Sequence, residues 1–305
     1  MIALFSLFIP WMLLLLTVIT ITLLIKRKWK YALAVALIAL SMNWWSGCFC
    51  FGLKNSSSGD IKVFSFNVNG VGAYDSGKVD AVISLIREES PDILYLTENF
   101  SPFGDSLHLR LQHIFPYNTR EKSSHNVIYS TKMIKEKRLL ETVEVGSSAY
   151  IIEARIGMNE RDVVVYGTHL SSNNYSKDMD YLTPGEVNSF QRIRKYADNI
   201  IGSSKLRVRE ANSIINAASG LDRVIVMGDL NDVCGSETLH TFNNAGLYDS
   251  WMEGGFGYGA TIHHPLPYRL DHVLHNDGLK LKGIKKIRTK NVSDHDALVA
   301  VFDLQ

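Results

Sequence analysis

The chain has 305 residues, 46% of them hydrophobic, and a formal net charge of +1 at pH 7, which allows one large domain or two small ones. Of its 32 basic residues, four lie between positions 26 and 30, so 28 basic residues oppose 31 acidic ones in the rest of the chain, a balance of −3. Proteins that bind long polynucleotides through their phosphates usually show the opposite balance, so this composition argues against duplex DNA as the main substrate.

The first 53 residues are the most apolar part of the chain. The stretch from Ile2 to Ile25 contains no charged residue and exceeds the roughly 20 residues that cross a bilayer core. The basic cluster at 26–30 follows, and a second apolar run extends from Tyr31 to Leu53. This pattern predicts two transmembrane helices joined by a short basic loop, with Trp44 and Trp45 at the membrane interface.

Each apolar segment has another interpretation. The first could be a signal peptide, but it lacks a basic start and an Ala-x-Ala-like cleavage site, and its apolar run is too long. The second contains Ser41, Asn43 and Ser46, and could instead be a re-entrant or interfacial helix. A lipidated Cys48 is disfavoured by the preceding tryptophan and the upstream span.

The basic loop predicts the orientation, because positively charged loops stay in the cytoplasm. Both termini, and everything after Lys54, are therefore expected on the extracytoplasmic side of a multi-pass cell-membrane protein. We predict a membrane anchor over residues 1–53, a flexible linker over 54–60 that contains Asn-Ser-Ser-Ser-Gly, and a single domain over 61–305.

The three cysteines do not suggest a disulfide framework or a zinc site. Cys48 and Cys50 lie near the predicted membrane segment, and Cys234 stands alone far along the chain. Cys234 is expected to be a small packed residue.

Strands and helices alternate through the predicted domain. The expected strands are 61–68, 93–96, 126–130, 149–155, 162–168, 224–227, 268–275 and 298–304. The expected helices are 78–89, 184–201, 206–218 and 237–245. The helices over 184–201 and 206–218 carry several basic residues. These residues form either a solvated face or a surface toward phosphate or lipid headgroups.

Val224 to Met227 is an apolar, β-branched run that predicts a strand buried on both faces, followed by Gly228-Asp-Leu-Asn-Asp. Other expected strands also end in polar residues. Each residue alone could be an ordinary turn polar or a satisfied core histidine. Their joint occurrence at strand ends predicts one site, built from Asn67, Glu98, His169, Asp229, Asn231, Asp271, Asp294 and His295.

The motifs around these residues resemble, in order, those of the endonuclease/exonuclease/phosphatase superfamily, whose members include DNase I-like nucleases, sphingomyelinases and phosphatases. They are Ser65-Phe-Asn-Val-Asn-Gly, Leu96-Thr-Glu, Gly167-Thr-His-Leu, Gly228-Asp-Leu-Asn-Asp, Arg269-Leu-Asp-His and Ser293-Asp-His-Asp. The resemblance spans about residues 62–304. It implies an α/β fold in four layers, a two-sheet β-sandwich flanked by helices. In this chain that domain follows the two transmembrane helices predicted from the apolar runs.

The resemblance also implies phosphoester hydrolysis with Mg²⁺, or Mn²⁺ in its place. Oxygen ligands suit such ions, and Asn67, Glu98 and Asp294 are the expected metal site. By the same resemblance, Asp229 positions the attacking water and Asn231 holds a phosphate oxygen. Asp271 pairs with His295, and His169 donates to the transition state or the leaving group.

Some positions depart from the family pattern. His125 and Asn126 stand where many members have a glycine, which places phosphate contacts from that turn in doubt. Glu121 and Glu153 are candidate carboxylate partners for His169, and Asn173 is a candidate phosphate contact.

Three functions remain open on the sequence alone. The first is a membrane-anchored phosphoesterase acting on a lipid-linked phosphate, a layout that resembles a family branch acting on polyprenyl pyrophosphate. The second is an extracytoplasmic nuclease that cleaves nucleic acid, and the third is an inactive scaffold with the same fold. The competent residue types at every acid, amide and imidazole position argue against the third.

Overall fold

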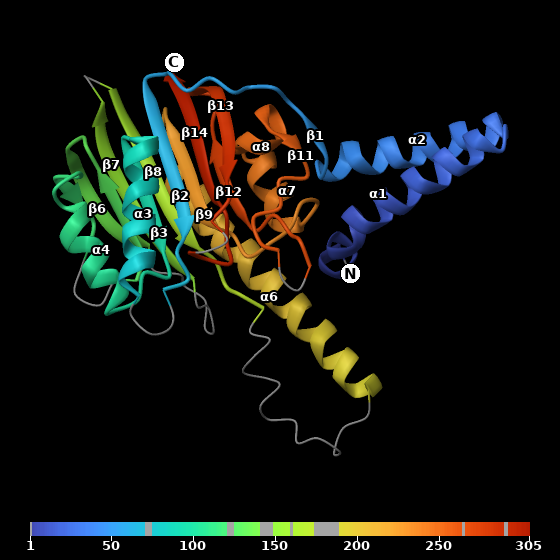
Figure 1. The fold of residues 1–305 in the computed structure, drawn as a ribbon, viewed down its shortest axis with the longest axis horizontal. Coiled ribbons are helices and arrows are strands. Elements are labelled where there is room, and N and C mark those ends of the chain that lie inside the picture. Colours follow the sequence, from blue (N-terminus) through green and yellow to red (C-terminus); the bar gives the residue numbers. More distant parts are fainter. Residues whose placement is uncertain are drawn as a thin grey trace.

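Two six-stranded β-sheets pack face to face and form the body of the molecule (Figure 1). The structure is a computed structural model and describes residues 2–70, 75–120, 125–140, 149–158, 161–173, 189–263, 266–289 and 292–305. Helices cover the outer face of each sheet, so the four layers expected from the sequence are confirmed.

The first sheet has the strand order β10-β12-β9-β8-β7-β6. Its strands are β6 (Ile134–Leu140), β7 (Tyr150–Met158), β8 (Arg161–His169), β9 (Val224–Asp229), β10 (Tyr248–Asp249) and β12 (Asp271–His275). Strands β8 and β9 are parallel, whereas β12 runs antiparallel to β9. The end of β9 therefore lies beside the end of β8 and the start of β12.

The second sheet has the order β13-β14-β2-β3-β5-β4. Its strands are β2 (Ile61–Asn67), β3 (Ile93–Thr97), β4 (Tyr117–Asn118), β5 (Val127–Ser130), β13 (Leu279–Ile287) and β14 (Ala297–Leu304). Strands β2 and β3 are parallel, so Asn67 and Thr97 end side by side. The start of β14 lies at the same edge, because β14 runs antiparallel to β2.

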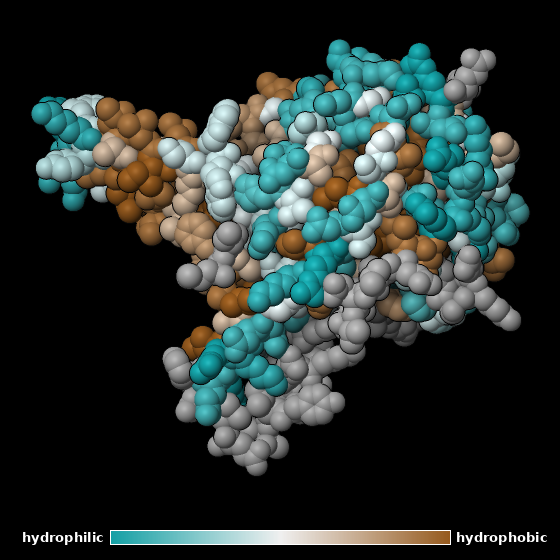
Figure 2. Space-filling view, turned by 180° about the vertical axis from the view of Figure 1, so that it is seen from behind, coloured by the Kyte–Doolittle hydropathy of each residue, from teal (hydrophilic) through white to brown (hydrophobic). Residues whose placement is uncertain are grey.

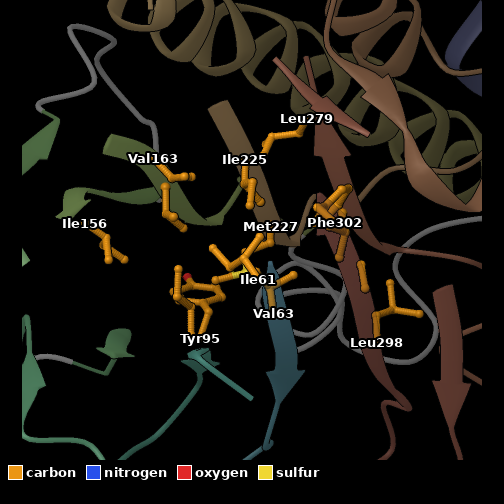
Figure 3. Close-up of a cluster of buried hydrophobic side chains, with 14 of the residues drawn as sticks. Ile61, Val63, Tyr95, Ile156, Val163, Ile225, Met227, Leu279, Leu298 and Phe302 are labelled. Atoms are coloured by element: carbon orange, nitrogen blue, oxygen red, sulfur yellow. The ribbon is translucent and has the colours of Figure 1, made fainter. Parts of the chain in front are cut away.

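The main core lies between the two sheets (Figure 3). In β9, Ile225 and Met227 point into it, whereas Val224 and Val226 pack under the outer helices. Successive side chains of a strand point to opposite faces, and all four are buried. The predicted strand buried on both faces is therefore confirmed.

Helices α3 (Ser76–Glu89) and α4 (Phe103–Leu111) cover the second sheet, and α6 (Ser189–Ala218) and α7 (Glu237–Asn244) cover the first. The prediction of two helices over 184–201 and 206–218 is wrong within the described residues, because α6 is continuous from residue 189. Gly202 lies inside α6, and one glycine costs a helix only about 1 kcal/mol. Residues 184–188 lie outside the described residues.

Several elements carry no strong sequence signal. Helix α4 was not predicted, nor were β6 and β13. In β6 most side chains are exposed, because it is an edge strand and presents little apolar alternation. In β13 lysines alternate with apolar residues and a register shift interrupts the pairing.

Helices α1 (Ile2–Ile25) and α2 (Trp29–Ser46) form a hairpin that projects from the sandwich (Figure 1). Among the described residues, one helix is long and apolar enough to cross a membrane, Ala3–Ile25. The second predicted span is shorter than expected. Helix α2 has 18 residues, and the chain after it forms strand β1 (Cys50–Phe51), which pairs with β11 (Phe256–Gly257).

A disulfide between Cys48 and Cys234 joins the end of the hairpin to the domain. The expectation that the cysteines form no disulfide is therefore wrong. The two residues are 186 positions apart with a Cα–Cα distance of 5.2 Å, and a pairing at that separation follows only from the folded chain. The sulfurs lie in a small apolar cluster with Ile9 and Leu13 of α1.

The predicted flexible linker runs alongside β13. Lys54 donates its backbone N–H to Gly254, and Ser56 donates to Lys282, at N···O distances of 3.1 and 3.2 Å. These backbone hydrogen bonds fix the segment to the domain, and helix α8 (Ser250–Gly254) lies beside it.

Candidate metal and catalytic site

Three neighbouring strands of the first sheet each place an ionisable side chain in the same row. His169, the last residue of β8, is paired in register with Asp229 at the end of β9, and Asp229 is paired with Asp271 at the start of β12. Adjacent strands lie about 4.8 Å apart, so sheet pairing alone brings these side chains within reach of one another.

The position directly before Asp229 must be glycine. Gly228 has φ +143°, and a Cβ there would lie 1.9 Å from the carbonyl oxygen of Thr168. The turn that follows is held by Asn231, whose backbone N–H donates to Asp229 Oδ1 at 2.8 Å. Asn231 Nδ2 donates to the carbonyl of Leu170 at 2.9 Å, which uses one of the two N–H groups of its amide.

The second sheet supplies the facing side of the site. Asn67 ends β2, and Glu98 directly follows β3 with φ 54°. Asn67 Nδ2 donates to Glu98 Oε1 at 3.0 Å and to Asp229 Oδ2 at 3.2 Å. The amide therefore bridges a carboxylate of each sheet.

His295 precedes β14 and lies beside two carboxylates of the first sheet. Its Nδ1 lies 2.7 Å from Asp271 Oδ2, and its Nε2 lies 3.9 Å from Asp229 Oδ2. Burial alone would lower its pKa, but the neighbouring carboxylates, Asp271 first, outweigh burial and raise the pKa of His295 to about 10. The ring is therefore an imidazolium at neutral pH and can donate from Nε2.

Asp229 is buried at the centre of the row. Burial raises its pKa above the usual value, and the nearby charge of Asp271 raises it further, against the opposing effect of His295 and His169. A carboxylate with a raised pKa is a better proton acceptor than an exposed one.

His169 Nε2 lies 3.7 Å from Glu98 Oε1 and 3.9 Å from Asp229 Oδ2. The suggestion that Glu153 is its partner is wrong, because Glu153 pairs with Arg138 at 2.7 Å and lies opposite Tyr166 in the β7–β8 register. Glu121 lies outside the described residues.

Asp294 is exposed and is linked to the site by Asn69, which is not among the predicted site residues. Asn69 Nδ2 donates to Asp294 Oδ1 at 2.8 Å. Ser293 adds a second link, because its hydroxyl donates to the carbonyl of Asn67 at 2.8 Å and accepts from His295 N at 3.0 Å. Asn69 could have been found, since it belongs to the same Asn67-Val-Asn-Gly motif.

A buried network supports the loop after Asp229. Arg207 of α6 is 2% exposed and its Nε lies 3.1 Å from Asp232 Oδ2. Its Nη1 donates to Asn173 Oδ1 and to the carbonyl of Ser171, both at 3.0 Å. Asn173, a candidate phosphate contact, is thus bonded to Arg207, and no sequence signal marked this arginine as buried.

The turn at His125 and Asn126 is tied to the neighbouring strand end. Asn99 N donates to the carbonyl of His125 at 2.8 Å, and the hydroxyl of Thr97 donates to Asn126 Oδ1. These contacts hold the segment that follows Glu98.

The side chains can hold a divalent cation. Ligand atoms of Glu98, His169 and Asp229 lie within 4.8 Å of one another. Asp271 Oδ1 is buried without a hydrogen-bond partner, so one carboxylate oxygen of the site remains able to accept a ligand. The carboxylate oxygens of Glu98 and Asp229 suit Mg²⁺ or Mn²⁺.

The raised pKa of His295 predicts how stability depends on pH. An unfolded histidine titrates near 6.5, so protonated His295 stabilises the folded chain below that pH, and the stabilisation is lost as the pH rises through about 10. We expect the free energy of unfolding to fall more steeply between pH 7 and 10 in the native chain than in His295→Gln. Urea denaturation in chelator at several pH values measures both slopes, and equal slopes would contradict the assignment.

Comparisons with known proteins agree with this arrangement. The sequence profile of the Endonuclease/Exonuclease/phosphatase family matches residues 64–295. No curated protein matches the chain.

Solved structures share the fold at low sequence identity. TDP2 from D. rerio, complexed with single-strand DNA product, is 13% identical with a TM-score of 0.58, over 79% of this chain and 98% of that one. A family protein from Leptotrichia buccalis is 18% identical with a TM-score of 0.56, over 79% and 99%. Beta toxin from Staphylococcus aureus is 17% identical with a TM-score of 0.53, also over 79% and 99%.

Proposed function

The chain belongs to the endonuclease/exonuclease/phosphatase family, and from this premise we propose that it is a membrane-anchored, Mg²⁺-dependent phosphoesterase that hydrolyses a lipid-linked phosphate. The observation that carries the proposal is the convergence of Glu98, His169, Asp229, Asp271 and His295 at one edge of the sandwich. The apolar hairpin, joined to the same domain by a disulfide, favours a substrate in the membrane.

Glu98 is the principal metal ligand in this proposal, with Asn67 beside it and Asp294 contributing from the rim through Asn69. A bound Mg²⁺ would neutralise phosphate charge and stabilise the developing charge on the leaving oxygen. The arrangement of Asn67 between Glu98 and Asp229 keeps the two carboxylates apart and oriented.

Asp229 accepts the proton of the attacking water, as its buried position and raised pKa favour. As the bond from phosphorus to the new oxygen forms, the bond to the leaving oxygen breaks, and His169 donates to that oxygen. The imidazolium of His295, held by Asp271, would donate from Nε2 to a non-bridging phosphate oxygen. The N–H of Asn231 that is not bonded to Leu170 would donate to the same oxygen.

Glu98→Gln tests the metal site. The substitution keeps the size of the side chain but removes its charge, so we expect the Mg²⁺ concentration for half-maximal activity to rise at least about tenfold, the lower end of the loss seen when groups around a metal are changed. Titration of the chelator-stripped protein with Mg²⁺ measures this. Glu136→Gln, on the exposed edge strand β6, is the control and should leave the titration unchanged.

We also propose that both hairpin helices cross the membrane and that the domain lies on the extracytoplasmic side. The basic residues at 26–30 occupy the tip of the hairpin, at the end away from the domain (Figure 1), and such loops remain cytoplasmic. The Cys48–Cys234 disulfide supports the same orientation, because disulfides persist mainly in oxidising compartments.

The substrate is tested with the full chain in lipid nanodiscs containing Mg²⁺, offered polyprenyl pyrophosphate, plasmid DNA or a soluble diester. Release of phosphate from the lipid, without DNA cleavage, is the expected result. Cleavage of DNA alone would replace the proposal by the second candidate, a surface nuclease. That candidate is favoured only by the likeness to a structure that holds single-strand DNA product.

A further inference from the structure

The small ribbon formed by β1 and β11 exposes a group of large apolar side chains at the base of the hairpin. Phe51 is 75% exposed, Phe256 is 68% exposed and Leu53 is 79% exposed. The rings of Phe51 and Phe256 meet edge to face with centroids 6.5 Å apart. We propose that these three side chains, the apolar wedge, insert into the interface of the bilayer that the hairpin enters. The inference rests on the membrane insertion contained in the proposed function.

The position of the apolar wedge follows from its rigid connection to α2. Only residues 47–49 separate the end of α2 from the start of β1. Asn43 Nδ2 donates to the carbonyl of Phe49 at 2.9 Å, and Phe49 N donates to Asn43 Oδ1 at 2.8 Å. The disulfide at Cys48 fixes the same turn to the domain. The wedge therefore lies where α2 leaves the lipid.

The tryptophans at the end of α2 lie at the same depth relative to the membrane as the wedge. Trp44 is 89% exposed, whereas the Trp45 ring packs against His240 of α7 with centroids 4.9 Å apart. Exposed tryptophan is typical of the membrane interface. The hairpin presents a hydrophobic surface where it projects from the domain (Figure 2), and the wedge residues are exposed beside its base.

A shallow groove of about 470 Å³ adjoins the wedge, lined by Leu53, Phe256, Trp251 and Ile284 with three lysines. Each lysine already has a carboxylate partner within the domain: Lys54 pairs with Glu253, Lys285 with Glu89 and Lys286 with Asp296. Because these charges are balanced, the surface attracts lipid through its apolar groups. We therefore expect the insertion to be insensitive to the anionic lipid content of the membrane.

Environment-sensitive probes on the full chain test the insertion. Cys50→Ser removes the buried free thiol, and a nitrobenzoxadiazole probe is then placed at Phe256→Cys. Leu37→Cys, midway along α2, reports insertion of the hairpin. Leu109→Cys, 60% exposed on α4 and on the far side of the sandwich from the hairpin (Figure 1), reports the aqueous phase.

In vesicles with headgroup-proximal spin-labelled lipid, we expect quenching at position 256 to be at least about twofold stronger than at position 109. Quenching at position 37 by acyl-chain spin-labelled lipid, without quenching at 256 by the headgroup-proximal label, would overturn the inference and leave the membrane anchor standing. No quenching at either position would overturn both. A severalfold rise at position 256 when neutral lipid is replaced by anionic lipid would show that the lysines bind headgroups and would overturn the apolar mode of insertion.

A second variant distinguishes membrane insertion of the wedge from an effect on folding. Phe51→Ser combined with Phe256→Ser changes only exposed side chains. We expect KM for a lipid-linked phosphate in vesicles to rise about tenfold, with unchanged kcat/KM for a soluble ester and an unchanged melting temperature. An unchanged KM in vesicles, or an equal loss on both substrates, would contradict the wedge; absence of all hydrolysis in the native chain would instead contradict the proposed function.

Discussion

Asp229→Asn is expected to lower kcat for phosphoester hydrolysis at least about 100-fold, the usual contribution of a general acid or base. The amide keeps the shape of the side chain, including an oxygen that can accept from Asn231 N, but it cannot accept a proton from water. Initial rates at saturating Mg²⁺ measure the loss. His295→Ala should cause a loss of the same order, because the phosphate then loses the imidazolium that Asp271 holds in place.

The matched control is Asp80→Asn, whose carboxylate lies on the exposed surface of α3 and pairs with Arg110. It should retain the native rate. Thermal melting separates chemistry from folding, since Asp229 is buried. The effects of residues that act together are not additive. The double variant Asp229→Asn/His295→Ala should therefore lose less activity than the product of the two single losses. Full activity in Asp229→Asn would refute the assignment, and no activity in the native chain on any phosphoester would favour the inactive scaffold.

Loss of the Cys48–Cys234 disulfide is expected to lower the free energy of unfolding by about 2–4 kcal/mol, because the bond closes a very long loop. Cys48→Ser combined with Cys234→Ser removes it. Activity should also fall, because Cys234 follows the Asp229–Asp232 turn by two residues and fixes that loop against the hairpin. Detergent-solubilised protein unfolded in guanidinium, with and without the double substitution, measures the stability change.

Cys50→Ser is the control for the disulfide, since Cys50 is the free cysteine. It should leave a chain with no titratable thiol until reductant is added. A reductant should destabilise this control and leave the Cys48→Ser/Cys234→Ser chain unchanged. Two free thiols in the unreduced control would contradict the pairing.

The strands that form the site could be predicted because their sequences are unambiguous. Val224–Met227 and its neighbours are buried on both faces, so they appear as short apolar runs, and each is followed or preceded by its site residue. The parallel pairing of β2 with β3 and of β8 with β9 then brings Asn67 beside Glu98 and His169 beside Asp229. The roles of these residues stay predictions until they are measured.

What could not be predicted depends on contacts between distant segments. The Cys48–Cys234 pairing joins residues that no local pattern relates. Arg207 resembles the solvated basic residues of α6 in sequence, yet it is buried because Asp232 and Ser171 meet it there. The carboxylates nearest to His169 belong to the facing sheet and the adjacent strand, and spacing along the chain cannot show that.

The pairing of His169, Asp229 and Asp271 in one row of the first sheet limits how this protein can diversify. Backbone hydrogen bonds set the separation of these groups, so no loop rearrangement can widen it without breaking the sheet. New substrate preferences would have to arise from residues outside the row. The same hydrolytic centre could therefore pass unchanged between descendants that act on very different phosphate esters.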